Sequence, residues 1–179
     1  SSDLLVLSDT YITQIAWSPQ AKRLIAVYQN SNIDLVDLKG NVINISDLYT
    51  KTITGDKTVS SIRIDDVYAY LICGFGIVII NMQRAEIVGS YKPSHPDYPT
   101  SLPDEDNSDY DKYIDIVKTL KPGGPKNNTN RFLRFKNNML LACTGIINGN
   151  FVPNIPATIT SWNGNEWTNY QDRLDTITG

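Results

Sequence analysis

The chain of 179 residues has few of the side chains that build metal and redox sites. It contains two cysteines and one histidine. Cys73 and Cys143 form no CxxC motif, and each ends a similar apolar run, so we expect small buried residues, with a disulfide or a reactive thiol as alternatives. No zinc site is expected from so few dispersed ligands.

The chain also lacks a long apolar run and a basic cluster. Its longest apolar stretch, Gly76–Ile80, has the length of a strand and falls far short of the ~18 residues that a membrane helix needs. Lysine and arginine together number 16 against 19 acidic residues, for a net charge of -3. Since nucleic-acid surfaces are basic, we expect neither a nucleic-acid partner nor a membrane span in this segment.

What the chain does have is short apolar runs that repeat in groups of four. They are rich in Ile, Val and Tyr and are separated by turn residues, as in antiparallel meanders. The first group comprises Ile12–Trp17, Arg23–Tyr28, Asn32–Asp37 and Asn41–Ser46. The second comprises Val59–Ile64, Val67–Cys73, Gly76–Met82 and Glu86–Tyr91. Equivalent runs lie about 40–50 residues apart, which is the blade period of a β-propeller.

A third group follows, opened by two insertions. Its runs are Arg131–Phe135, Met139–Cys143, Ala157–Trp162 and Glu166–Gln171. The last two are joined at Asn163-Gly164, a strong signal for a type I′ hairpin turn because both central residues need positive φ. The long insertion is polar and proline-rich and spans residues 92–130, and the shorter one, Ile146–Pro156, is expected to be a loop.

The middle runs of the second group indicate how the groups pack. Val67–Cys73 and Gly76–Met82 are almost continuously apolar, so both faces of their sheet must be covered. Propeller blades stack face to face and supply that cover. The links are too short for the helices of a parallel α/β fold. The predicted fold class is therefore all-β, a β-propeller segment of about three four-stranded antiparallel blades.

The predicted organisation is a single partial propeller domain over residues 1–179. Blade 1 covers about residues 12–46, blade 2 about 59–91 and blade 3 about 131–171. Since propellers close with ~4–8 blades, we expect an open arc or an association that covers its outer faces. The remaining blades of a longer parent chain are the expected neighbours.

No catalytic constellation is evident in the sequence. His95, the single histidine, sits in a turn-rich stretch, and no GxSxG nucleophile elbow accompanies it. Trp17, Trp162 and Trp167 are interpreted as blade-packing residues rather than a sugar platform. We expect no enzyme activity, no catalytic residue and no cofactor site.

One acidic stretch in the long insertion is a weak calcium candidate. Asp104, Asp106, Ser108 and Asp115 fall at positions one, three, five and twelve of an EF-hand-like loop. Asp109 stands where the sharp turn needs glycine, so a solvated loop is favoured over a metal site. Just beyond, residues 109–120 have apolar side chains at helical spacing, which favours a surface helical turn over a short strand at Tyr113–Thr119.

Several stretches resemble the N-terminal propeller of PorZ-like proteins. These are Gln29–Val36, Ile53–Ile62, Ala69–Val78, Lys121–Asn127, Arg131–Phe135 and Trp162–Trp167. The resemblance implies an exported protein of a Gram-negative cell envelope, periplasmic or on the cell surface, that serves the type IX secretion attachment complex. It implies recognition without catalysis, with a protein or a glycan or lipopolysaccharide-type ligand as the partner.

Two alternatives remain at this stage. The same repeats resemble the periplasmic ligand-sensing propellers of hybrid two-component histidine kinases. A propeller enzyme acting on glycans is the other possibility, and it requires carboxylates or His95 to converge on one pocket.

Overall fold

The computed structural model describes residues 6–51, 57–93, 121–124, 129–143, 146–147, 153–155 and 158–170. Its strands form three main antiparallel sheets and one small hairpin. The first sheet has the order β1-β2-β3-β4, namely Ile12–Ser18, Arg23–Tyr28, Ile33–Asp37 and Val42–Ile45. The second contains β5 to β8, namely Val59–Asp65, Tyr68–Cys73, Gly76–Asn81 and Glu86–Pro93. The third has the order β10-β11-β14-β15, namely Thr129–Phe135, Asn138–Cys143, Thr158–Trp162 and Trp167–Asn169.

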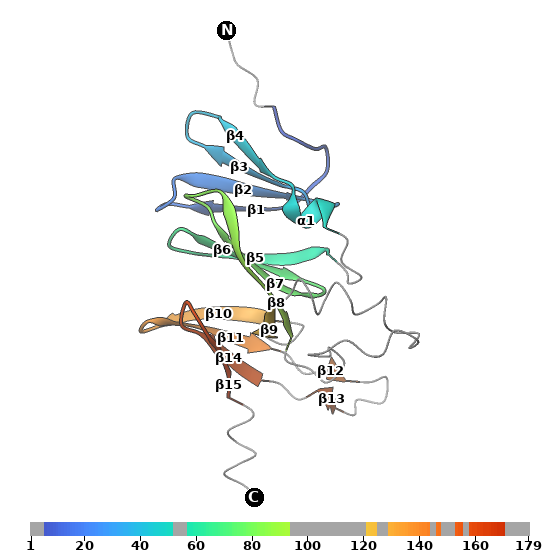
Figure 1. Ribbon diagram of the computed structural model, residues 1–179, viewed down its shortest axis with the longest axis vertical. Helices are drawn as coiled ribbons and strands as arrows, with labels where there is room; N and C mark the ends of the chain where they lie inside the picture. Colours follow the sequence, from blue (N-terminus) through green and yellow to red (C-terminus); the bar gives the residue numbers. More distant parts are fainter. Residues whose placement is uncertain are drawn as a thin grey trace, which may run out of the picture.

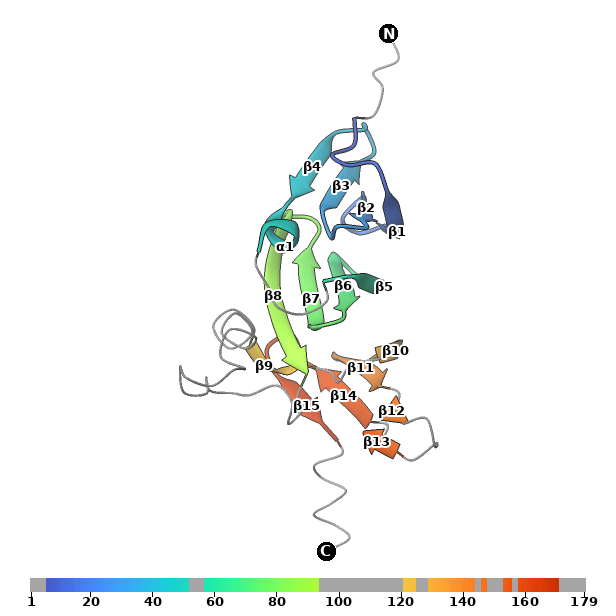
Figure 2. The same cartoon turned by 90° about the vertical axis from the view of Figure 1, so that its right-hand side faces the viewer.

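The three sheets stack in a row in chain order, and the described chain does not close into a ring (Figure 1). The first strands β1, β5 and β10 lie along one side of the row, and the last strands β4, β8 and β15 lie along the other (Figure 2). This is the arrangement of successive propeller blades, with one edge of every blade turned to the same side. The all-β, incomplete-propeller prediction is confirmed, while the single-domain division of residues 1–179 stays a prediction.

The second sheet is buried on both faces, and alternation along its strands explains why. Side chains on one face of β6 and β7 pack against the first sheet, and those on the other face pack against the third. Leu71 and Ile80 belong to the first packing layer, whereas Tyr70 and Ile79 belong to the second. Since neighbouring residues of a strand point to opposite faces, a continuous apolar run is the expected sequence of such a strand.

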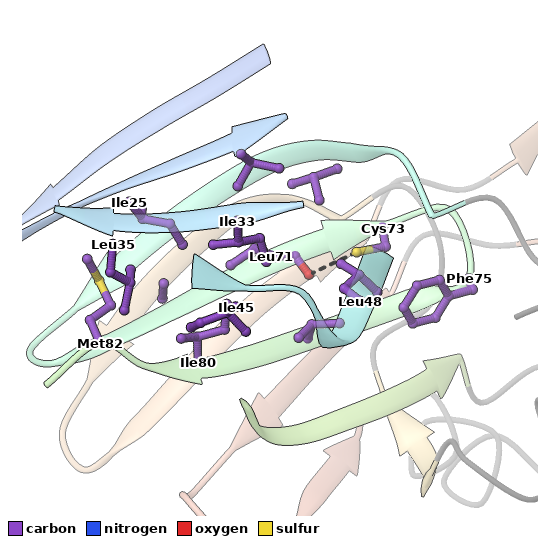
Figure 3. Close-up of a cluster of buried hydrophobic side chains, with 14 residues drawn as sticks. Ile25, Ile33, Leu35, Ile45, Leu48, Leu71, Cys73, Phe75, Ile80 and Met82 are labelled. Carbon is purple, nitrogen blue, oxygen red and sulfur yellow. Dashed lines mark hydrogen bonds between the residues drawn. The ribbon is translucent and has the colours of Figure 1, made fainter. Parts of the chain in front are cut away.

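The layer between the first two sheets is aliphatic. It is filled from β2, β3, β6 and β7, with Leu48 from helix α1 (Asp47–Thr50) and Phe75 from the β6–β7 turn closing one end (Figure 3). Cys73 is buried there, with its Sγ 3.8 Å from the Leu71 carbonyl oxygen. This matches the small, buried residue expected at position 73.

One turn recurs in all three blades where the third strand ends. In the first blade the Asp37 carboxylate accepts hydrogen bonds from the backbone N–H groups of Lys39 and Asn41. Asn81 of the second blade and Asn163 of the third accept equivalent pairs with their side-chain oxygens. Such Asx turns order the connection to the last strand and define equivalent positions in the three blades.

Four elements were not expected from the sequence. Helix α1 follows the first sheet, β9 (Lys121–Gly124) adds to the second, and β12 (Ile146–Ile147) pairs with β13 (Pro153–Ile155). The prediction of a plain loop over Ile146–Pro156 was therefore wrong for the paired residues. Strand β9 runs parallel to β8 and pairs with it near Tyr91. Its sequence of one lysine, one proline and two glycines has almost no intrinsic preference for a strand, so only the tertiary pairing defines it.

Candidate functional site

A cavity of about 450 Å³ opens between the second and third sheets. It is lined by residues of β6, β7, β8, β10 and β14 and of the two turns that carry Asn81 and Asn163. The described lining residues are Tyr68, Tyr70, Ile79, Arg84, Val88, Gly89, Tyr91, Arg134, Trp162, Asn163, Gly164 and Asn165. The size falls within the range of about 300–1,000 Å³ that is typical of small-ligand sites.

The first interface is filled at the corresponding place. Arg23 begins β2 and pairs with Asp37 across the sheet, and its Nη1 donates to the carbonyl oxygens of Met82 and Gln83 at 2.7 and 3.2 Å. Met82 follows the Asx turn residue Asn81 and is fully buried against the first sheet. One long side chain from each blade therefore occupies this end of the first interface.

The second interface has different residues at both of these positions. Tyr68 begins β6 and pairs with Asn81, so it is the equivalent of Arg23. Gly164 follows Asn163 and is the equivalent of Met82. A Cβ placed at Gly164 would meet no atom of the described chain within 4 Å, and the φ of +95° at this residue favours glycine. The cavity lies where the first interface holds the side chains of Arg23 and Met82.

An aromatic cluster forms the inner wall of the cavity. The ring centroids of Tyr91 and Trp162 are 5.1 Å apart, those of Tyr91 and Trp167 are 5.5 Å apart, and those of the two tryptophans are 4.6 Å apart. Gly89 makes room for this cluster, because a Cβ at that position would lie 2.6 Å from the Tyr91 ring. Edge-to-face contacts of this kind stabilise the interface beyond the area that they bury.

Two arginines bring positive charge to the cavity. Arg84 forms an ion pair with Glu86 at 2.8 Å, and Arg134 pairs with Asp65, with its Nε 3.2 Å from Oδ1. The described lining includes both guanidinium groups and no carboxylate. Two cationic side chains therefore line the cavity, each ion-paired with a carboxylate of a residue outside the described lining.

The buried hydroxyls of Tyr70 and Tyr91 at the cavity have raised pKa values and stay protonated at neutral pH. Burial raises the pKa of Tyr70 to about 12, Tyr68 adds to the shift, and a hydrogen bond with the Trp162 side chain opposes it. Burial also raises the pKa of Tyr91. These groups serve as neutral hydrogen-bond donors and acceptors, so the described lining is equipped to hold a ligand through rings, hydroxyls and guanidinium groups.

The packing around the cavity is less complete than in the first interface. The side-chain oxygen of Thr160 and the indole nitrogen of Trp167 are buried, and neither has a hydrogen-bond partner in the described part of the chain. An unsatisfied buried group costs about 1–3 kcal/mol. The second interface tolerates such groups together with an unfilled volume.

Most of the candidate site residues singled out in the sequence are not among the residues that the structure describes. His95 and the calcium candidates Asp104, Asp106, Ser108 and Asp115 are outside the described residues, as is the 109–120 stretch. No group of three or more potential metal ligands occurs within the residues that are described. Trp162 and Trp167 pack between sheets as predicted, whereas Trp17 keeps 41 % of its surface exposed.

The cavity itself was not anticipated. Among its lining residues the sequence singles out only the segment around Trp162, with that tryptophan interpreted as a packing residue, and the two arginines carry no motif. The one usable signal lies in the repeats, because alignment of the Asx turns places Tyr68 opposite Arg23 and Gly164 opposite Met82. At the second interface a tyrosine ring stands in place of the longer arginine, and glycine stands in place of methionine. The smaller side chains leave space between otherwise similar blades.

Stacked four-stranded meanders with a recurring Asx turn define the class of the protein as a β-propeller. Residues 2–108, more than half of the chain, match the family described as TSS9, PorZ, N-terminal beta-propeller domain. The chain belongs to this family of type IX secretion system propellers.

Solved structures support the fold. PorZ of Porphyromonas gingivalis, described as an essential bacterial surface component of the type IX secretion system, is 20 % identical with a TM-score of 0.50. The match covers 91 % of this chain and 22 % of PorZ, so this chain spans only about a fifth of the length of that relative.

Two other solved structures are more distant. The N-terminal domain of Nup159 is 5 % identical, with a TM-score of 0.45 and coverage of 91 % of this chain and 30 % of that one. The WD40 domain of SCAP from fission yeast is 13 % identical, with a TM-score of 0.40 and coverage of 92 % and 45 %. No curated protein sequence matches the chain. Among the described residues, no helix has the length and apolar character needed to cross a membrane.

Proposed function

We propose that this chain is a noncatalytic binding and scaffolding module of an exported cell-envelope protein that serves type IX secretion. Membership of the PorZ propeller family carries the proposal. Its partner is a protein of the secretion machinery, or a glycan or lipopolysaccharide-type ligand, on the periplasmic side or at the cell surface. The stacked blades support this role, because propellers present rigid edges and inter-blade surfaces for recognition.

A gene deletion in the encoding bacterium tests the proposal. Removal of the coding region for residues 1–179 should abolish display of a type IX cargo reporter on the cell surface, and the intact gene should restore it. Cell fractionation should find the protein in the envelope. Unchanged cargo display would refute a role in secretion, and a changed transcriptional response with normal display would favour the sensing propeller of a histidine kinase.

A second variant tests the absence of catalysis. The complementing gene would carry His95→Ala together with Asp104→Asn and Asp106→Asn. Full restoration of cargo display is expected, since a scaffold needs no acid, base or metal ligand at these positions. If the variant protein is present at normal abundance and fails to restore display, the noncatalytic assignment is contradicted. A functional role would then be assigned to the substituted residues of the long insertion.

A further inference from the structure

The cavity between the second and third sheets has the features of a ligand site rather than of incidental empty space. Its counterpart in the first interface is filled by Arg23 and Met82, which shows that this blade geometry packs closed when long side chains are present. At the second interface Tyr68 and Gly164 leave it open. The opening is therefore encoded by particular residues and not by the blade geometry.

The charges of the cavity select for an anionic group. Arg84 and Arg134 come from different blades, one from the β7–β8 turn and one from β10, and both line the same volume. Their partners Glu86 and Asp65 are not among the described lining residues. A guanidinium group has five N–H donors. Arg134 uses three of them, two on the Asp65 carboxylate and one on the Asn137 carbonyl oxygen, and Arg84 binds a single carboxylate. Each arginine therefore keeps N–H groups that can donate to a second carboxylate.

The rest of the lining selects for a flat ring. Trp162 and the tyrosines at positions 68, 70 and 91 present aromatic surfaces within the same volume. Aromatic side chains gain most from other flat groups in offset or edge-to-face contact. The hydroxyls of the tyrosines and the amides of Asn163 and Asn165 supply neutral hydrogen-bonding groups at the rim.

We propose that this cavity binds a ligand that carries a carboxylate next to a flat ring, with the carboxylate on Arg84 and Arg134 and the ring against Trp162 and Tyr68. Two kinds of ligand carry a carboxylate next to a flat ring in this way: a free aromatic acid and the C-terminal aromatic residue of a polypeptide. The inference goes beyond the proposed function and is tested separately from it, because binding is measured on the purified chain and secretion is measured in cells.

Calorimetric titration of the full 179-residue chain tests the ligand class. The probes are N-acetyl-L-tyrosine and a short peptide that ends in tyrosine, each compared with its C-terminal amide. Both acids should bind, and each amide should bind about ten- to hundredfold more weakly, because a charge-assisted hydrogen bond is lost.

The same titrations distinguish the two sources of the ligand. Tighter binding of the peptide identifies a polypeptide terminus as the source, and equal binding identifies a free acid. Equal affinity of acid and amide, or no binding by either acid at millimolar concentration, overturns the proposal.

Matched arginine variants locate the site. Arg84→Gln should weaken binding of the acids by about tenfold, and it leaves the fold intact because Arg84 is largely exposed. Arg23→Gln makes the same chemical change at the closed interface and should leave the affinity unchanged. An unchanged affinity in Arg84→Gln, or an equal loss in Arg23→Gln, rules out the assigned site.

A closing variant tests the origin of the cavity. Tyr68→Arg places at the second interface the residue that donates to two backbone carbonyls at the first. It should abolish binding of N-acetyl-L-tyrosine while the urea unfolding transition stays cooperative. Retained affinity in a folded Tyr68→Arg protein would contradict a ligand seated between Tyr68 and the Asn163 turn.

Discussion

The two inter-sheet interfaces share the same central sheet, yet different residues fill them. The first is an aliphatic layer closed by Arg23, whose guanidinium group bonds to two carbonyl oxygens of the next blade. The second is an aromatic layer with an ion pair and a cavity of about 450 Å³. In this propeller, therefore, the side chains at two equivalent positions decide whether a blade interface is filled or contains a cavity.

Adjacent isoleucines of β7 provide the sharpest test of this difference. Ile80 points to the first sheet and Ile79 to the third, and both are buried. Truncation of a buried isoleucine costs about 2–5 kcal/mol, with more where the surroundings cannot relax. We expect about 4 kcal/mol for Ile80→Ala and about 2 kcal/mol for Ile79→Ala, since Ile79 already borders the cavity. Urea unfolding measures both, and equal losses would show that the two interfaces are packed alike.

The aromatic layer has its own sensitive position at Gly89. Gly89→Ala would press a methyl group against the Tyr91 ring, which also contacts the rings of Trp162 and Trp167. Overpacking of this kind costs about 1–3 kcal/mol. The loss should be accompanied by a change in tryptophan fluorescence. In a Tyr91→Leu background, Gly89→Ala should reduce the free energy of unfolding by less. An equal reduction in both backgrounds would show that the added methyl group does not act through the Tyr91 ring.

These features differ in how far the sequence predicts them. The strand Arg23–Tyr28 and the burial of both faces of β6 and β7 follow from local alternation and continuous apolar runs, and the structure confirms them. The pairing of β9 with β8 joins residues about thirty positions apart in a segment of weak strand preference, so no local pattern reveals it. The cavity exists because Tyr68 and Gly164 leave space that longer side chains fill at the first interface. That difference is visible only when the blades are aligned with one another.

The arginines of the two interfaces should differ in cost and in salt dependence. Arg23→Met leaves two carbonyl oxygens in the interface without their donor and should cost about 1–2 kcal/mol at any salt concentration. Arg134→Met removes a partly exposed ion pair with Asp65 and should cost below about 1 kcal/mol, less still in high salt. Unfolding at low and at high sodium chloride separates the two. A salt-dependent loss for Arg23→Met would show that its charge, not its hydrogen bonds, stabilises the first interface.

The smallest expected effect comes from two tyrosines: Tyr28 on the face of the first sheet that points away from the first interface, and Tyr70 in the second interface. Burial raises the pKa of Tyr28 to about 12, aided by its hydrogen bond to the Asp34 carboxylate, and burial raises that of Tyr70 to about 12. A raised pKa in the folded state means that the folded chain holds the proton more tightly than the unfolded chain, whose tyrosines titrate near 10. Stability is therefore complete below pH 10 and falls as the pH rises towards 12.

At pH 11 the expected loss is about 1 kcal/mol for each tyrosine. Tyr28→Phe and Tyr70→Phe should each reduce the alkaline slope of the unfolding free energy, and the double variant should keep only a smaller slope, since burial also raises the pKa of Tyr91. Because Tyr70 borders the cavity, a ligand bound there should steepen the loss in the wild-type chain and leave it unaltered in Tyr70→Phe. An alkaline slope as steep in the double variant as in the wild-type chain would assign the titration to other groups.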